Sequence, residues 1–248
     1  MHNPPNMGDV YDVFAKAFRE ADQLPTWQFV GKPAMEALLR DSAPDMQFLD
    51  LGSASARVEV GVLIPHDVAP GNITGVEISP EQVEMARMRV PGARFEVGDI
   101  ADPNLLAGEE EQYDVVLSHM VFEHLDDAQL AWACANAYRL LKAGGTFAFV
   151  VTHPDKMTDL EGNLVTTYGS FITTAPWGGE LHNWRRSIAT TREIVEDVGF
   201  AVSGVSEIAF PTEPPAGLDP EQEATFRAAA EKYRRYPAIR LALHATKA

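Results

Sequence analysis

The chain has 248 residues, 46% of them hydrophobic and 23% charged, which is the composition of a folded protein with a sizeable core. Its 36 acidic and 20 basic residues give a formal net charge of −16, which argues against nucleic acid or an anionic membrane as the main partner. Cys134 is the only cysteine, which excludes an internal disulfide and a cysteine-rich zinc site. No run approaches the roughly 18 apolar residues of a membrane span. The N-terminus lacks the basic start and apolar run of a signal peptide, so we expect a cytoplasmic protein.

Two helices are predicted in the first forty residues. Within residues 11–21, Val13, Phe14 and Ala17 recur at helical spacing. Residues 33–40 begin with a proline and have an apolar face, which predicts a second, shorter helix.

From residue 47 the pattern alternates between strands and helices. Apolar runs predict strands at residues 47–51, 73–78, 93–97, 114–117 and 146–151. Ser79, Pro80 and Gln82 have the spacing of a helix start with a capping box. Asp126 or Asp127 is expected to cap the next helix, which Gly144 ends. This alternation predicts a parallel sheet with right-handed crossovers.

The last hundred residues are less regular at first. Aromatics, glycines and prolines dominate residues 154–186, as in a binding loop or lid. A helix is predicted at residues 190–198 with a capping box from Thr190 to Glu193, and another at residues 220–234. Residues 200–210 and 238–246 bring the number of predicted strands to seven.

Polar residues stand at the ends of successive predicted strands. The first strand ends in Asp50-Leu51-Gly52, the second in Glu77, the third in Asp99 and the fourth in Ser118-His119-Met120. In an open parallel sheet, ligands bind outside these strand ends, at the point where the strand order reverses. If the ligand is a nucleoside, an acid after the second strand can accept hydrogen bonds from the ribose hydroxyls. An acid after the third strand can accept a hydrogen bond from the amine of adenine. Asp102 is the alternative to Asp99 for that role.

At these positions the chain resembles the class I S-adenosylmethionine-dependent methyltransferases. The matching stretches are FLDLGSASAR, ITGVEISPEQVEMAR, ARFEVGDIAD, YDVVLSHMVFEHLDD and LLKAGGTFAFVV, in family order. Tyr11-Asp12 in the first helix makes the small-molecule members of the family the best match. The resemblance implies an α/β, Rossmann-like, doubly wound seven-stranded sheet, mostly parallel with the last strand antiparallel.

The resemblance also implies one domain with four parts. These are a helical cap at residues 1–40, a cofactor-binding half at 41–153, a lid at 154–189, and C-terminal strands and a helix at 190–248. It further assigns the cofactor contacts by position. Asp50, Gly52, Ser53 and Ala54 are expected at the methionine moiety, Glu77 and Ile78 at the ribose and adenine, Asp99 and Ile100 at the adenine, and Ser118, His119 and Met120 beside the sulfonium.

One feature departs from the family pattern. After the first strand, Gly52 is followed by Ala54 and Ala56, where the family usually has two more glycines. An added Cβ restricts φ and narrows the approach of the main chain to a ligand. Tolerated drift and weakened cofactor binding are the two explanations.

Several side chains are candidates for contact with a substrate. His119, His153 and His182 are candidate general bases, because a neutral imidazole near pH 7 can accept a proton. His124 is interpreted as structural. Aromatic residues form a further group, proposed to surround the substrate: Tyr11, Tyr168, Phe171, Trp177 and Trp184. No paired-ligand spacing of histidines occurs, so we expect no metal site.

The first functional hypothesis is transfer of a methyl group from S-adenosylmethionine, with S-adenosylhomocysteine as product, to an oxygen or nitrogen of a small metabolite. The alternative is a protein of the same fold that binds S-adenosylmethionine without methyl transfer, for a rearrangement, a cyclisation or a binding role. A nicotinamide dinucleotide is disfavoured, because its pyrophosphate needs Gly-x-Gly-x-x-Gly. We expect a small-molecule substrate, no nucleic acid or membrane partner, and a monomer or homodimer.

Overall fold

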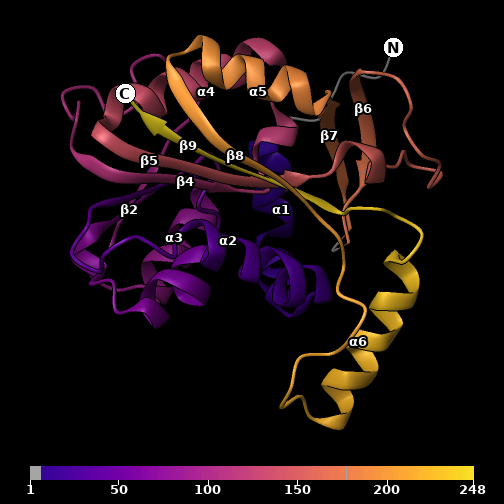
Figure 1. Ribbon diagram of the computed structural model, residues 1–248. Helices are drawn as coiled ribbons and strands as arrows, with labels where there is room; N and C mark the ends of the chain where they lie inside the picture. The colour runs from indigo at the N-terminus through magenta and orange to yellow at the C-terminus, as the bar shows by residue number, and fades with distance from the viewer. Residues whose placement is uncertain (1–6, 177) are drawn as a thin grey trace.

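The computed structural model describes residues 7–176 and 178–248. Its centre is a seven-stranded sheet in the order β3-β2-β1-β4-β5-β9-β8 (Figure 1). The strands are β1 (Phe48–Leu51), β2 (Ile73–Glu77), β3 (Arg94–Val97), β4 (Tyr113–His119), β5 (Leu141–Thr152), β8 (Phe200–Ile208) and β9 (Arg240–Lys247). The first five are parallel, and β9 is antiparallel to both neighbours. The predicted fold class is therefore confirmed.

The strand order reverses between β1 and β4: β1 pairs with β2 on one side and with β4 on the other, so Asp50 lies opposite Gly75 and Leu117. All four residues of β1 are buried, as expected for a central parallel strand that is covered on both faces. The reversal opens a crevice at the carboxyl ends of these strands, where α/β proteins bind their ligands.

Helices cover both faces of the sheet. In Figure 1, α4 (Asp127–Leu140) and α5 (Ile188–Asp197) lie above the sheet, and α2 (Lys32–Leu38) and α3 (Pro80–Arg89) lie below it. The core under α4 includes Leu130, Cys134 and Ala137, which recur at helical spacing on its buried face. Short helical turns complete the described elements: Ala21–Gln23, Trp27–Gly31, Glu59–Leu63, Ile64–His66, Pro70–Asn72, Phe122–His124 and Pro154–Lys156.

Two predicted element ends are wrong. The helix α4 ends at Leu140, not at Gly144, because Leu141 turns into extended conformation and pairs with Tyr113 at the start of β5. The helix α5 is capped by Ser187, whose Oγ accepts from the N–H of Thr190, so Thr190 lies inside the helix. Other predicted ends differ by a few residues, as those of α1 (Met7–Glu20) do.

The predicted lid contains an element that the sequence did not indicate. Residues of β6 (Gly169–Thr174) and β7 (Glu180–Arg185) pair as an antiparallel hairpin. Arg186 follows β7 and is buried; its guanidinium donates to the main-chain oxygens of Phe122 and Leu125 and contacts Asp127 at 2.9 Å. These contacts of Arg186 join the hairpin to the segment that follows β4.

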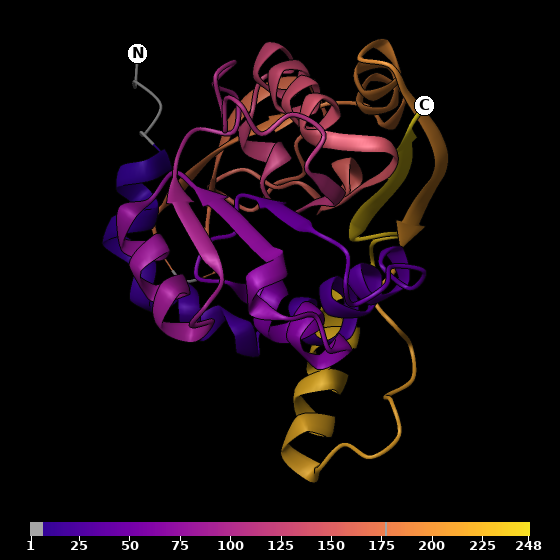
Figure 2. The same ribbon diagram turned by 90° about the vertical axis from the view of Figure 1, so that its left-hand side faces the viewer.

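The helix α6 (Pro220–Tyr233) stands away from the sheet in both views (Figures 1 and 2). It has a small core of its own, in which Phe226 packs against Phe29 and Phe210 at ring-centroid distances of 5.0 and 5.4 Å. Asp219 caps it with the reciprocal contact from Gln222. No helix in the described part of the chain is both long and apolar enough to span a bilayer.

Candidate functional site

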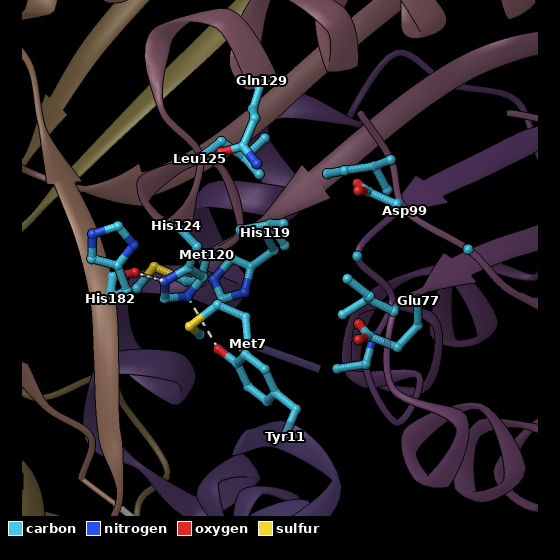
Figure 3. A pocket seen from close by; sticks show the side chains of 16 residues that line it. Met7, Tyr11, Glu77, Asp99, His119, Met120, His124, Leu125, Gln129 and His182 are labelled. Carbon is cyan, nitrogen blue, oxygen red and sulfur yellow. Dashed lines mark hydrogen bonds between the residues drawn. The ribbon is translucent and has the colours of Figure 1, made fainter. Parts of the chain in front are cut away.

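A cavity of about 290 Å³ opens at the carboxyl ends of β1 to β4; we call it the first cavity (Figure 3). Ten residues singled out in the sequence line it: Tyr11, Gly52, Ala54, Glu77, Ile78, Asp99, Ile100, His119, Met120 and His182. Six more complete its wall: Met7, Gly98, Val121, His124, Leu125 and Gln129. Figure 3 shows Glu77 and Asp99 on one side, opposite Tyr11, His124 and His182.

Glu77 is fixed in place by main-chain donors. Its Oε2 accepts from the N–H of Ala54 at 3.0 Å, and its Oε1 accepts from the N–H of Ser79 at 2.9 Å. Burial raises the pKa of Glu77, and these hydrogen bonds oppose that rise. A carboxylate oxygen can accept more than one hydrogen bond, so Glu77 retains capacity for ligand hydroxyls.

The same contacts alter the predicted capping box. The Oγ of Ser79 caps α3 by accepting from the N–H of Gln82 at 3.2 Å. The N–H of Ser79, however, donates to Glu77, so the Gln82 side chain does not complete the box. The N–H of Ser79, at the start of α3, therefore helps to orient the carboxylate of Glu77.

Asp99 lies at the far end of the same wall. Its Oδ1 accepts from the N–H of Ala101 at 2.8 Å, and its Oδ2 makes no hydrogen bond within the described part of the chain. Ile78 and Ile100 add apolar surface beside it. Asp102, the alternative acid, instead accepts from the N–H of Asn104 at 2.8 Å and does not line the cavity.

The turn after β1 keeps the conformation that glycine favours, although two of its residues are alanines. Gly52 has φ 85°, and Ala54 and Ala56 have φ 46° and 63°. An L-residue in this region costs on the order of 1–2 kcal/mol, because its Cβ approaches the following carbonyl oxygen. The turn is held by hydrogen bonds from the N–H groups of Gly52 and Ser53 to Val76 O at 2.8 and 3.0 Å.

We expect Ala54→Gly to raise the free energy of unfolding by about 0–1 kcal/mol, because relief of strain exceeds the added entropy of the unfolded chain. The affinity for S-adenosylhomocysteine is expected to be equal or tighter. Urea denaturation and calorimetry measure the two quantities. Ala128→Gly in α4 is the control and should destabilise by about 0.5–1 kcal/mol. Weaker ligand binding by the Ala54 variant would show that the alanine methyl itself contributes.

Three of the predicted contact residues lie beneath this turn and not on the cavity wall. Asp50 is 2% exposed, Ser53 is buried, and the buried Ser118 donates from Oγ to Leu51 O at 2.6 Å. Asp50 is a neighbour of the buried carboxyl of Glu59, and burial together with this neighbour raises the pKa of Asp50 well above its usual range. Burial raises the pKa of Glu59 to about 7.

This carboxyl pair makes a prediction about pH. Unfolded Glu59 loses its proton near pH 4.5, whereas the folded state holds it to about pH 7, so the folding stability from this group falls as the pH rises through that window. We expect Glu59→Gln to be increasingly stable relative to the parent chain from pH 5 to pH 8, as measured by urea denaturation. Glu84→Gln, at an exposed site of α3, should give a difference that does not change with pH. A constant difference for Glu59→Gln would contradict the raised pKa.

The helix α1 covers the first cavity. Asp12 Oδ1 accepts from Ser79 Oγ at 2.5 Å and so joins α1 to the start of α3. On the other side, Tyr11 OH lies 3.1 Å from His124 Nε2, and His124 Nδ1 lies 3.1 Å from His182 O (Figure 3). Because a carbonyl oxygen only accepts, His124 Nδ1 carries the proton, and Nε2 accepts from Tyr11. Both nitrogens of His124 are therefore used to join α1, the turn after β4 and the hairpin.

A second cavity of about 180 Å³ adjoins the first, and Tyr11, His119, Met120 and His124 line both. Met120 has φ 62°, a strained conformation held by a hydrogen bond from its N–H to Val150 O at 2.7 Å. His119 packs edge-on against Trp27. Burial, helped by the charges of Arg57 and Arg240, lowers the pKa of His119 well below 6.5, so its imidazole is neutral at physiological pH.

The other predicted substrate residues that the structure describes lie outside both cavities. The buried His153 accepts from the N–H of Asp155 at Nδ1 and contacts Glu207 at 2.8 Å through Nε2. Tyr168 is exposed beneath the guanidinium of Arg185, and Trp184 faces a small void under β5. Phe171 lies on β6 and lines neither cavity, and Trp177 lies outside the described residues.

The sequence patterns do not indicate the four charged residues that line the second cavity, which are Arg57, Glu123, Lys156 and Arg240. Arg240 gives the clearest retrospective signal, because it is a charged residue inside an apolar strand pattern. Lys156 and Glu123 lie in short turns, whose conformation the sequence does not indicate. Within residues 7–176 and 178–248, no group of three or more His, Cys, Asp or Glu side chains is arranged to hold a metal ion.

A family model described as a methyltransferase domain matches residues 49–149, the stretch that includes β2 to β4 and most of β1 and β5. The match covers less than half of the chain, so residues 49–149 are similar to that domain. The resemblance carried by the sequence motifs is thus confirmed, and the matched stretch holds the strand ends that line the first cavity.

Curated proteins show a similarity over a comparable length of the chain. An uncharacterized methyltransferase of Synechocystis sp. is 29% identical over 105 residues, which are 42% of this chain and 48% of that protein. The chain spans 32% and 48% of the lengths of the two curated relatives that it matches.

Solved structures extend the similarity of fold beyond the methyltransferase domain. An S-adenosylmethionine-dependent methyltransferase from Mesorhizobium loti has a TM-score of 0.65 at 18% identity, over 91% of this chain and 99% of that one. The [4+2]-cyclase SpnF has a TM-score of 0.67 at 16% identity, over 98% and 97% of the two chains. The fold is that of the class I S-adenosylmethionine-dependent methyltransferases.

Proposed function

We propose that this protein transfers a methyl group from S-adenosylmethionine to an oxygen or nitrogen of a small metabolite. The observation that carries the proposal is the pair of adjoining cavities at the strand switch point. The first has two acids on its wall, Glu77 and Asp99, and it meets the second at His119 and Met120. One cavity for a nucleoside cofactor and one for an acceptor is the arrangement that a two-substrate transfer requires.

The residues of the first cavity fit the cofactor. Glu77 would accept from the ribose hydroxyls, and Asp99 Oδ2 from the adenine amine. The close approach at Gly52, where a Cβ would lie 2.3 Å from Val121 Cγ2, leaves room for a ligand only if this residue has no side chain. S-Adenosylmethionine, when bound, supplies a methyl group that its sulfonium already activates.

The protein's own contribution is orientation, exclusion of water and acceptance of a proton. The hydrogen-bonded chain from Tyr11 through His124 to the main chain of His182 closes the first cavity on the side of α1. His119 lies at the boundary between the cavities and is the first candidate base, because its neutral imidazole can accept a hydrogen bond from a hydroxyl or amine acceptor. Burial and the charges of Arg57 and Arg240 lower its pKa, so it is a weak base. His182 also lines the first cavity and is the second candidate. His153 has partners at both ring nitrogens and is left out of this proposal.

Calorimetry with S-adenosylmethionine and S-adenosylhomocysteine tests the proposal. Binding of both is expected, followed by release of S-adenosylhomocysteine when a panel of hydroxyl and amine metabolites is added. Absence of binding by either compound would overturn the proposal.

A second candidate function is binding of S-adenosylmethionine without methyl transfer, in a rearrangement or cyclisation. The strained alanines at positions 54 and 56 favour it, because they replace glycines in the turn nearest the cofactor. The similarity of fold to a cyclase is compatible with it. Binding of S-adenosylmethionine with no methyl transfer to any member of the panel would support this second function over the first.

A further inference from the structure

The second cavity has an unusual charge for so acidic a chain. Three basic side chains line it, and they come from separate segments: Arg57 after β1, Lys156 in the turn after β5, and Arg240 at the start of β9. Glu123 is the only acidic residue on its wall among the described residues. The chain as a whole has a formal net charge of −16, so a positive cavity is a local feature and not a reflection of composition.

Arg57 already has a carboxylate partner. Its Nε donates to Asp22 Oδ1 at 2.8 Å, and its guanidinium lies over the ring of Trp27. Its charge is therefore compensated within the protein.

Arg240 and Lys156 differ from Arg57 in this respect. Arg240 is 6% exposed, its Nη1 donates to Ile239 O at 3.0 Å, and its Nε has no partner among the described residues. Lys156 Nζ lies 5.5 Å from the centroid of the Tyr233 ring and forms no ion pair within residues 7–176 and 178–248. Burial and the nearby charges of Arg240 and Lys232 lower the pKa of Lys156 to about 7. A buried charge is costly unless it is paired, so Arg240 faces the cavity with an unmet requirement for an anionic partner, and half-buried Lys156 adds a second basic group without an ion pair.

Glu123 does not meet this requirement. It is 3% exposed, and its Oε1 accepts from Thr152 Oγ1 at 3.0 Å. Its Oε2 has no partner in the described part of the chain, and no ion pair joins it to Arg240 or Lys156 there. With Arg57 compensated by Asp22, two basic side chains, Arg240 and Lys156, face one carboxylate, Glu123, whose Oε2 is a free acceptor close to them.

We infer that the methyl acceptor carries an oxyanionic group, a carboxylate or a phosphate, which binds Arg240 and Lys156 in the second cavity. The inference rests on the proposed function for the identity of the ligand as acceptor. Guanidinium and ammonium groups form their strongest hydrogen bonds with such oxyanions. The nucleophile of the same molecule then lies toward His119 and Met120, where the two cavities meet. Glu123 Oε2 is available to accept from a hydroxyl or amine of this acceptor.

Calorimetry on protein saturated with S-adenosylhomocysteine tests the inference. The probes are benzoate and phenyl phosphate, with benzamide and benzyl alcohol as neutral compounds of similar size. At least one anion is expected to bind on the order of 10- to 100-fold more tightly than the neutral compounds, because charge-assisted hydrogen bonds are gained. Preference for benzoate or for phenyl phosphate identifies the oxyanion. Equal affinities, or no measurable binding of either anion, would overturn the inference.

Two variants and one matched control locate the binding. Lys156→Met and Arg240→Met are each expected to weaken anion binding at least about 10-fold, with the affinity for S-adenosylhomocysteine unchanged. Lys232→Met is the control, because Lys232 lies over the same Tyr233 ring, with Nζ 5.4 Å from its centroid, but does not line the cavity. Equal effects of Lys156→Met and Lys232→Met would contradict the inference. If Arg240→Met fails to fold, the Lys156 and Lys232 variants decide.

The outcome is separable from that of the proposed function. Binding of S-adenosylhomocysteine without anion preference would overturn the inference alone. Failure of S-adenosylhomocysteine to bind would overturn the proposed function, and the anion measurements on the protein alone would still test the cavity.

Discussion

Replacing Glu77 by alanine is expected to weaken the binding of S-adenosylhomocysteine by about 1.5–3 kcal/mol, which is on the order of 10- to 150-fold in Kd. The variant removes the carboxylate that we propose accepts from the ribose hydroxyls. It also removes the acceptor of the N–H groups of Ala54 and Ser79, so the turn after β1 and the start of α3 lose a shared anchor. Calorimetry measures the change directly.

The control for this variant is Glu81→Gln, which changes an exposed carboxylate in the first turn of α3 and should leave the affinity unchanged. Glu77→Gln keeps one acceptor oxygen and is expected to lie between the parent chain and Glu77→Ala. Circular dichroism on each variant separates loss of binding from loss of fold. An unchanged affinity in folded Glu77→Ala would show that the ribose is bound elsewhere.

The sequence predicts Glu77 because its position depends on local pattern. A strand must end where Ile73 to Val76 give way to a capped helix, and the residue between them must lie at the edge of the sheet. The same reasoning places Asp99 after β3. Parallel strands then bring both acids to one cavity with no information beyond the order of the elements.

The second cavity depends on contacts that no local pattern encodes. Arg57, Lys156 and Arg240 are separated by 99 and 84 residues, and they meet because β9 inserts beside β5 and α6 packs against the turn at Trp27–Gly31. The hairpin of β6 and β7 is likewise not predicted by a local pattern. Its strands are short and half-exposed, and polar residues or glycine stand at their ends. His153 illustrates the opposite case, because its position after β5 predicts an active-site role, but Glu207 of β8, which lies beyond β9 in the sheet, occupies its Nε2.

Gly52→Ala is expected to lower the free energy of unfolding by about 2–5 kcal/mol and to abolish measurable binding of S-adenosylhomocysteine. The new Cβ would lie 2.3 Å from Val121 Cγ2 and 2.9 Å from Val121 Cγ1. It would also sit on a residue with φ 85°, where an L side chain is strained. Val121 lines the first cavity, so relief of the contact moves its side chain within the space that the cofactor needs.

A double-mutant cycle separates the two causes. Val121→Ala removes both γ carbons, so Gly52→Ala should cost about 1–3 kcal/mol less in that background than in the parent chain, as measured by urea denaturation. The strain at positive φ remains in both backgrounds. Its size alone is given by Gly108→Ala, because Gly108 has φ 90° and no atom within 4 Å of the added Cβ. Gly52→Ala is expected to lower the free energy of unfolding more than Gly108→Ala does. An equal loss in the two variants would show that Val121 moves aside without energetic cost, and that its closeness does not explain the glycine at position 52.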